Sequence, residues 1–402
     1  MNKTKLLSEL IQEQWLNNRA TSLDQKFQGN KAWSFSCEHE LFVIDNDTGE
    51  IATVERTSDL IHTFGKAHGW KHKGNYAGML PKYSCELSDN RYTQIKFDTE
   101  PHLIEIAFTY FWDLEEFHKH LSLVINSLYL CASDLNLVLK TNADVPENQS
   151  HLIEPQTDYF KGLRDFRRAI QHGDKKLTAK EANYGALIAS TQIHIGGPFI
   201  NSENEEDFIT AMYSEEPNVI AYSHNSSPSQ PRWKYYERVY GEFPLLGFPK
   251  EEKFRFKRWF ENICKSPIYD EDIFPLHKNV STISTKDYES LKIAERFKKI
   301  RDFQIIRPRV YGTLEFRADP AQENAAAIFS LLLLRLGLCG YHFYNPSKVS
   351  LVNAHNSWWK QIRTERFEKD TQVLERASIG LRSINSKNSK FLDAKGLYWD
   401  AA

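Results

Sequence analysis

The sequence has 402 residues, a formal net charge of −2, and ordinary shares of hydrophobic (41%) and charged (26%) residues, as a soluble globular protein does. A charge so close to zero gives no electrostatic reason to bind nucleic acid or an anionic membrane, so we expect neither as a partner. The five cysteines are scattered and contain no CxxC pair, which argues against a disulfide framework or a zinc knuckle.

Helical patterns recur along the chain. In residues 1–18, Leu6, Leu10 and Trp15 fall on one side of an amphipathic helix, and the polar residues among them argue against a signal peptide. Acidic Asp113, Glu115 and Glu116 suit the start of a second helix. The full set of predicted helices is 1–18, 57–68, 113–136, 157–172, 251–264, 286–300 and 320–344.

Strand-like runs lie between these helices, and several of them alternate polar and apolar residues. We predict strands near 33–44, 91–97, 102–109, 137–142, 189–197 and 309–317, and loops over 143–157, 196–207 and 222–250. Strands and helices do not alternate strictly, so a doubly wound parallel sheet is not favoured. The sequence predicts an α+β fold with a curved, mainly antiparallel sheet and helices packed on its outer face.

The most apolar stretch runs from Ala325 to Leu338. It is too short to span a bilayer and contains Arg335, which indicates a buried core helix. Asp319-Pro320 would begin this helix, with proline at the first helical position. Without an export or membrane signal, we expect a cytoplasmic protein. We predict one catalytic domain over 1–402, in which residues 1–30 lead into a core of 31–345 and 346–402 form a helical extension.

Polar residues interrupt the predicted strands at four places. In Cys37-Glu38-His39-Glu40, the two glutamates share one strand face, and two such carboxylates repel unless a cation or solvent screens them. For an ExE pair taken alone, a solvated sheet face is the ordinary explanation. Glu105 lies in an apolar strand after Asp98, and a buried glutamate needs a partner, either an arginine or a metal.

The other two places lie further along the chain. His194 follows Gln192 in the alternating run TQIHIGG, where a hydrogen-bonded core histidine is the plain alternative to a ligand. Glu315 and Arg317 share a face of the run GTLEFR, where an ordinary ion pair would explain them.

Together these places put several carboxylates and a histidine on strands of one fold. Magnesium prefers oxygen ligands and often shares them with substrate phosphates. The sequence has no Walker A motif and no GxGxxG, so metal ions and arginine side chains would have to neutralise the phosphates of a nucleotide.

The order and spacing of these motifs resemble the plant-type and bacterial carboxylate–amine ligases of the glutamate–cysteine ligase superfamily, whose catalytic fold is similar to that of glutamine synthetase. The resemblance runs from Trp33 to Gln322, and includes the segment Ile220 to Pro228 and the closing GTLEFR with Asp319. It implies a bowl-shaped antiparallel sheet on which Mg²⁺ ions bridge ATP to carboxylates. The metal ligands that it implies are Glu38, Glu40, Asp98, Glu105, His194 and Glu315.

The resemblance also implies roles for arginines. Arg317 would contact the nucleotide phosphates, and Arg238 would face the anionic site. Arg307 and Arg309 could bind phosphate or a substrate carboxylate, or lie on the surface. No residue is assigned to recognition of the amine.

The implied reaction joins the γ-carboxylate of glutamate to the amine of cysteine through an acyl phosphate formed with ATP. No side-chain nucleophile is required, so we expect Cys37 to be dispensable for activity. Open alternatives are another acid or amine in a specialised pathway, a small-molecule phosphotransferase, and a binding protein without activity. A homo-oligomer is possible with any of these.

Overall fold

The computed structural model describes residues 33–76, 80–87, 91–98, 102–142, 188–200, 204–223, 305–309, 312–349, 369–393 and 396–397. The helices predicted within 1–18, 157–172, 251–264 and 286–300, and the loops predicted over 143–157 and 222–250, lie wholly or almost wholly outside these residues.

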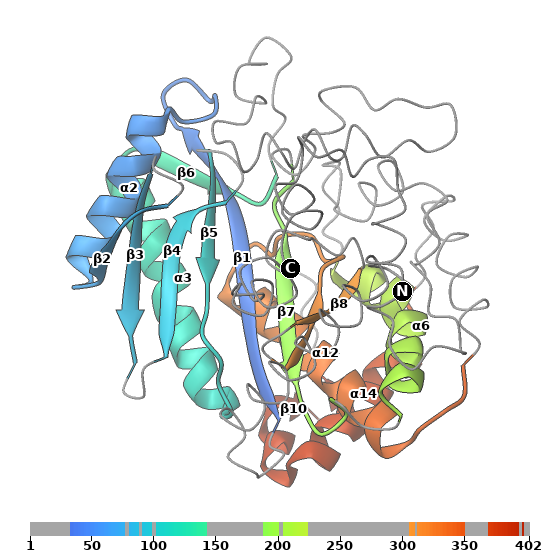
Figure 1. The fold of residues 1–402 in the computed structure, drawn as a ribbon. Coiled ribbons are helices and arrows are strands. Elements are labelled where there is room, and N and C mark those ends of the chain that lie inside the picture. Colours follow the sequence, from blue (N-terminus) through green and yellow to red (C-terminus); the bar gives the residue numbers. More distant parts are fainter. Residues whose placement is uncertain are drawn as a thin grey trace, which may run out of the picture.

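One nine-stranded sheet organises the described part of the chain (Figure 1). Its strand order is β2-β3-β4-β5-β1-β7-β9-β8, and β6 also pairs with β1. Every pairing between its strands is antiparallel. The strands are β1 (Ser34–Asp45), β2 (Lys71–Tyr76), β3 (Leu80–Glu86), β4 (Tyr92–Phe97), β5 (Leu103–Ala107), β6 (Leu137–Lys140), β7 (Thr191–Gly196), β8 (Ile306–Arg309) and β9 (Thr313–Phe316).

Within the described ranges, five α-helices accompany this sheet: α2 (Val54–Ala67), α3 (Leu114–Asp134), α6 (Glu205–Ser223), α12 (Ala325–Tyr344) and α14 (Thr371–Ile384). In Figure 1, α3 runs behind strands β3 to β5. The chain then forms a short 3₁₀ helix, η3 (Ser386–Phe391), and the small hairpin β10 (Leu392–Asp393) and β11 (Gly396–Leu397). The predicted α+β class with a mainly antiparallel sheet is confirmed.

Alternation along β1 separates the hydrophobic core from a polar face of the sheet. Cys37, Leu41 and Val43 belong to one buried cluster together with residues of α2, α3, α12 and α14. Side chains at alternate positions of a strand point to opposite faces. Glu38 and Glu40 therefore point away from this cluster, onto the face opposite the helices.

Two predicted elements differ from the structure near residue 315. The run 309–317 is not one strand, because it belongs to two paired strands, β8 and β9, joined by a tight turn. Gly312 adopts a φ of 76°, which glycine accepts without steric cost. The predicted helix start at Asp319-Pro320 is also wrong. The N-cap of α12 is Asn324, whose side chain accepts from the Ala327 amide.

Helix α12 is long and apolar enough to cross a membrane by length and composition alone. However, 72% of its most apolar window is buried inside the protein. The helix packs against α3, α6, α14 and the sheet, as predicted for a buried core helix.

Candidate functional site

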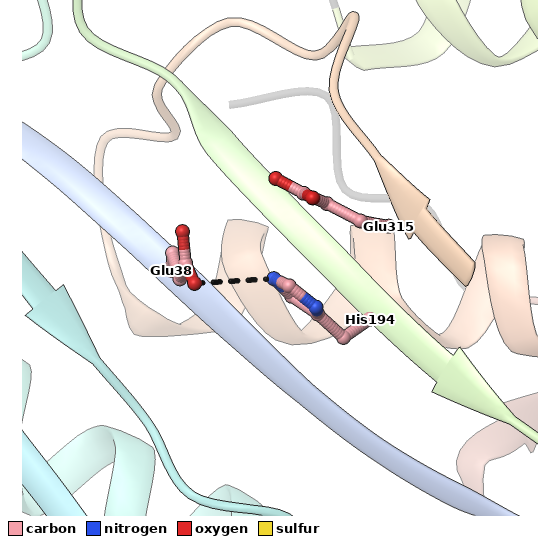
Figure 2. Close-up of side chains that lie close together, drawn as sticks. All are labelled: Glu38, His194 and Glu315. Atoms are coloured by element: carbon pink, nitrogen blue, oxygen red, sulfur yellow. Dashed lines mark ion pairs between the residues drawn. The ribbon is translucent and has the colours of Figure 1, made fainter. Parts of the chain in front are cut away.

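Three neighbouring strands of the polar face bring Glu38, His194 and Glu315 together (Figure 2). His194 on β7 lies directly opposite Glu315 on β9, and Glu38 comes from β1 on the other side of β7. One ligand atom from each of the three side chains can be chosen so that all three atoms lie within 4.8 Å of one another. This separation is small enough for one metal ion to contact all three.

The surroundings of His194 fit a metal ligand better than a hydrogen-bonded core histidine. Its side chain is 3% exposed, and neither ring nitrogen has a hydrogen-bond partner among the described residues. The Nε2 atom lies 3.5 Å from Glu38 Oε1, which is too long for a strong hydrogen bond. Buried polar atoms rarely lack a partner, so the unsatisfied imidazole is consistent with a ligand-binding role.

Glu38 is held in its charged form. Burial alone would raise the pKa of this carboxyl, but the contact with His194 and the charges of Arg309 and Lys96 hold the pKa well below its usual range. The carboxylate is therefore ionised at neutral pH, as a metal ligand must be.

Both oxygens of Glu315 contact arginines. Arg309 Nη1 donates to Oε2 at 2.9 Å, and Arg317 Nε lies 3.3 Å from Oε1. The Glu315 side chain is only 2% exposed. The ion pair between Glu315 and Arg317, which was the ordinary alternative to a ligand role, is present, and Arg309 adds a second one.

Glu40 shares the polar face with Glu38, but hydrogen bonds hold its carboxylate. The backbone amide and the hydroxyl of Ser190 donate to Oε2 at 2.9 and 2.7 Å, and Gln192 Nε2 donates to Oε1 at 2.7 Å. Neutral donors satisfy both oxygens in this arrangement, and they fasten β1 to the start of β7.

Glu105 lies opposite Glu40 across the β1–β5 pairing. Its partner is a lysine and not the expected arginine, since Lys96 Nζ lies 2.6 Å from Oε1. Burial raises the pKa of Glu105 to about 8, with Lys96 opposing the rise and Glu38 and Asp98 adding to it. Asp98 follows β4, so its charge acts on Glu105, but it is not part of the Glu38–His194–Glu315 group.

Two predicted arginines are less defined. Arg307 is opposite Glu315 in the β8–β9 register, but its side chain lies outside the described residues, as does the whole of Arg238. Sequence reasoning missed Lys96 and gave Gln192 no role. Both alternate with apolar residues in predicted strands, which places them on the polar face, but only the strand register shows which glutamate each one meets.

The donor set suits a hard divalent cation in part. Glu38 and Glu315 supply the carboxylate oxygens that Mg²⁺ and Mn²⁺ prefer. Two ligand atoms of one Mg²⁺ ion lie roughly 3–4 Å apart. The ligand atoms of Glu38, His194 and Glu315, within 4.8 Å of one another, are therefore only slightly further apart than they would be around a bound ion. An imidazole is a less usual ligand for Mg²⁺ and suits Mn²⁺ or other transition metals better.

No protein-family model matches the chain, and no curated protein gives a significant match. The likeness to glutamate–cysteine ligases therefore rests on the motifs in the sequence and on nothing else.

Proposed function

We propose that this protein is an ATP- and Mg²⁺-dependent carboxylate–amine ligase of the glutamate–cysteine ligase type. Its proposed substrates are the γ-carboxylate of glutamate and the amine of cysteine, and its proposed compartment is the cytoplasm. The observation that carries the proposal is the convergence of Glu38, His194 and Glu315 on the polar sheet face, with Arg309 and Arg317 in contact with Glu315.

Three features support a site for a metal and an anion. The face offers the ionised carboxylate of Glu38 and an unsatisfied imidazole, both of which are metal ligands. It also offers guanidinium groups, which bind phosphate or carboxylate oxygens through two parallel hydrogen bonds. In the described part of the chain the helices pack on one face of the sheet, and the candidate ligands lie on the other.

In this proposal, Glu38, Glu315 and His194 would hold a divalent cation, and Glu105 would join them when its contact with Lys96 is exchanged. The cation, when bound, supplies charge neutralisation for the phosphates of ATP. Arg317 is buried beside Glu315, with a side chain 8% exposed. Its guanidinium would orient the nucleotide and stabilise the negative charge of the transferred phosphoryl group.

The chemistry itself has two steps. A substrate carboxylate oxygen attacks the γ-phosphorus of ATP, and ADP leaves, which gives an acyl phosphate. The amine then attacks the activated carbonyl carbon and loses a proton, and phosphate leaves as the amide forms. The residues of the chain contribute by positioning and by charge, so no covalent enzyme intermediate is needed.

The test is to measure ADP release by the purified protein with Mg²⁺, ATP, glutamate and cysteine, omitting each component in turn. Mass spectrometry of the product accompanies the assay. We expect ADP release to require both amino acids and the product to have the mass of γ-glutamylcysteine.

Two other results would change the proposal. Amide formation with a different acid or amine would keep the reaction and correct the substrates. A phosphorylated small molecule without any amide would identify a phosphotransferase, and the ligase reaction would be rejected.

A further inference from the structure

Arg309 differs from Arg317 although both contact the same carboxylate. Arg309 is the last residue of β8, beside the turn at Gly312, and its side chain is 22% exposed. Arg317 follows β9 and is 8% exposed. Arg309 therefore has room to leave Glu315 that Arg317 lacks.

Arg309 also acts on a second member of the group. Glu38 and Glu315 each offer a ligand atom within 4.8 Å of the other, so the guanidinium that contacts Glu315 also lies close to Glu38. The positive charge of this one guanidinium thus offsets the negative charge of two of the three candidate ligands. It contacts Glu315 directly and acts on Glu38 through space.

A divalent cation bound by Glu38 and Glu315 would meet this guanidinium at close range. Like charges at such a separation repel strongly in a partly buried site. The cation and Arg309 therefore compete for the same negative charge. A phosphate group beside the cation would relieve the competition, because it offers Arg309 an alternative anion that it can bind through two hydrogen bonds.

We propose that Arg309 is an internal counter-ion, which occupies Glu315 until a divalent cation binds and then transfers to the phosphate oxygens of the nucleotide. The inference rests on the proposed function and deepens it. Binding of the metal and binding of the nucleotide would therefore strengthen each other. The cation displaces Arg309 from Glu315, and the phosphate then binds Arg309 and relieves its repulsion with the cation.

The test measures binding and needs no turnover. Mn²⁺ is titrated into the protein and followed by electron paramagnetic resonance, first without nucleotide and then with a non-hydrolysable ATP analogue. Arg309→Met removes the charge and keeps much of the apolar length of the side chain. We expect this variant to bind Mn²⁺ about tenfold more tightly than the wild type without nucleotide. We also expect the analogue to strengthen Mn²⁺ binding less in the variant than in the wild type.

Two further variants serve as controls, one for the charge at residue 309 and one for the position of the substitution. Arg309→Lys keeps the positive charge and should bind Mn²⁺ with nearly wild-type affinity. Arg56→Met removes a partly exposed arginine from an ion pair with Asp45, away from the three ligands, and should leave Mn²⁺ binding unchanged. If Arg309→Met does not fold, Arg309→Gln, which retains a hydrogen-bond donor for Glu315, replaces it in the same comparison.

A folded variant without charge at residue 309 that binds Mn²⁺ no more tightly than the wild type would overturn the counter-ion role. Weaker binding of both Mn²⁺ and the analogue would mean that Arg309 merely supports the structure of the site. If the wild type itself binds neither Mn²⁺ nor the analogue, the proposed function fails as well. Wild-type binding of both, with no difference in the variant, rejects the counter-ion role alone.

Discussion

Neighbouring residues of β1 have opposite environments, as the pair Cys37 and Glu38 shows. Cys37 is fully buried in the core, and burial, with a further effect of Glu38, raises the pKa of its thiol well above the usual value. The thiolate is the reactive form of cysteine. Cys37 is therefore unreactive, although the next residue belongs to the candidate site.

We accordingly expect Cys37→Ala to retain nearly all of the proposed ligase activity. The loss of the buried sulfur should lower the free energy of unfolding by roughly 1 kcal/mol. Alanine is preferable to serine here, because a serine hydroxyl would be buried among apolar side chains without a partner. ADP release and urea unfolding measure the two effects. Loss of activity in a variant that is still folded would place the thiol in the reaction.

Arg317→Lys tests whether Arg317 acts by geometry as well as by charge. Lysine keeps the charge next to Glu315 but cannot form two parallel hydrogen bonds to phosphate oxygens. We expect kcat/KM for ATP to fall by about 100-fold, while the thermal midpoint changes little. An unchanged rate would assign Arg317 to a purely structural ion pair.

Sequence patterns predicted the residue types of the site better than their contacts. The motifs named Glu38, His194 and Glu315, and the structure brings these three together. The same motifs could not show that neutral donors hold Glu40 or that Lys96 contacts Glu105. Those contacts depend on the register between strands far apart in the sequence, and a single strand pattern does not encode that register.

Individual elements were predictable where one strong pattern governed them. The helix near 113–136 is α3, and its N-cap Asp113 accepts from the amides of Glu115 and Glu116, as the acidic start of that segment suggested. Helix α6 was missed because Pro217 lies inside it and its apolar residues follow no clear stripe. The edge strand β2 and its neighbour β3 were also missed. Helix α14 lies within the segment 346–402, which was predicted to be a helical extension without bounds for any single helix.

Helix α14 packs unusually closely against α12. A Cβ atom on Gly380 would collide with the backbone oxygen of Gly337 and the amide of Tyr341, so the two helix backbones are nearly in contact. Glycine lowers helix propensity, but at residue 380 it lets the two helices approach this closely. The stability of α14 depends on packing that only glycine permits.

Gly380→Ala should therefore destabilise the protein although alanine is the better helix former. We expect the free energy of unfolding to fall by about 1–3 kcal/mol, because the two helices must separate to admit a methyl group. Ile379→Ala on the same helix, at a partly exposed position, is the control and should change it by no more than about 0.5 kcal/mol. Urea unfolding followed by circular dichroism measures both variants. A more stable Gly380→Ala protein would contradict the close packing.

At the scale of the whole molecule, buried ion pairs connect the sheet to three helices. Arg335 of α12 contacts Asp319, which lies just after β9, and it also contacts Glu216 of α6. Glu215, the residue before Glu216, accepts hydrogen bonds from His342 of α12 and Arg376 of α14. These pairs cross between segments that are far apart in the sequence, so sequence patterns alone did not predict them.

Glu215 makes the stability of the whole fold depend on pH. Burial opposes ionisation, but hydrogen bonds from His342 and Arg376 outweigh it and lower the pKa of Glu215 from 4.5 to about 2. A carboxyl with a lowered folded pKa stabilises the protein above its unfolded pKa. That stability is lost as the pH falls from about 4.5 towards 2, and it amounts to about 3 kcal/mol.

We expect Glu215→Gln to flatten the fall in the free energy of unfolding between pH 5.5 and about 2.5, relative to the wild type. The variant is less stable than the wild type at neutral pH, and the two curves approach each other in acid. Urea unfolding at a series of pH values gives both curves. Parallel curves would show that Glu215 does not titrate in this range.

Arg335→Met should be the most damaging of the substitutions considered. Arg335 and its two carboxylate partners are fully or almost fully buried, so removal of the guanidinium leaves Asp319 and Glu216 buried without their cation. Removing one member of a buried pair costs about 3–5 kcal/mol. Arg376→Met is the matched control, because it removes a guanidinium from Glu215, the residue beside Glu216, while Glu215 keeps His342 as a partner.

The Arg335→Met substitution should also affect the candidate site, because Asp319 lies close to Arg317 in the chain. Only Ala318 separates Asp319 from Arg317, and Arg335 Nε contacts Asp319 Oδ2 at 2.6 Å. Loss of this contact frees the chain just beyond β9, where Arg317 is held against Glu315. We therefore expect the fraction of Arg335→Met that remains folded to bind the ATP analogue more weakly than Arg376→Met does, as isothermal titration can measure. Equal affinities in the two variants would show that Arg335 contributes to the stability of the fold and not to the geometry of the site.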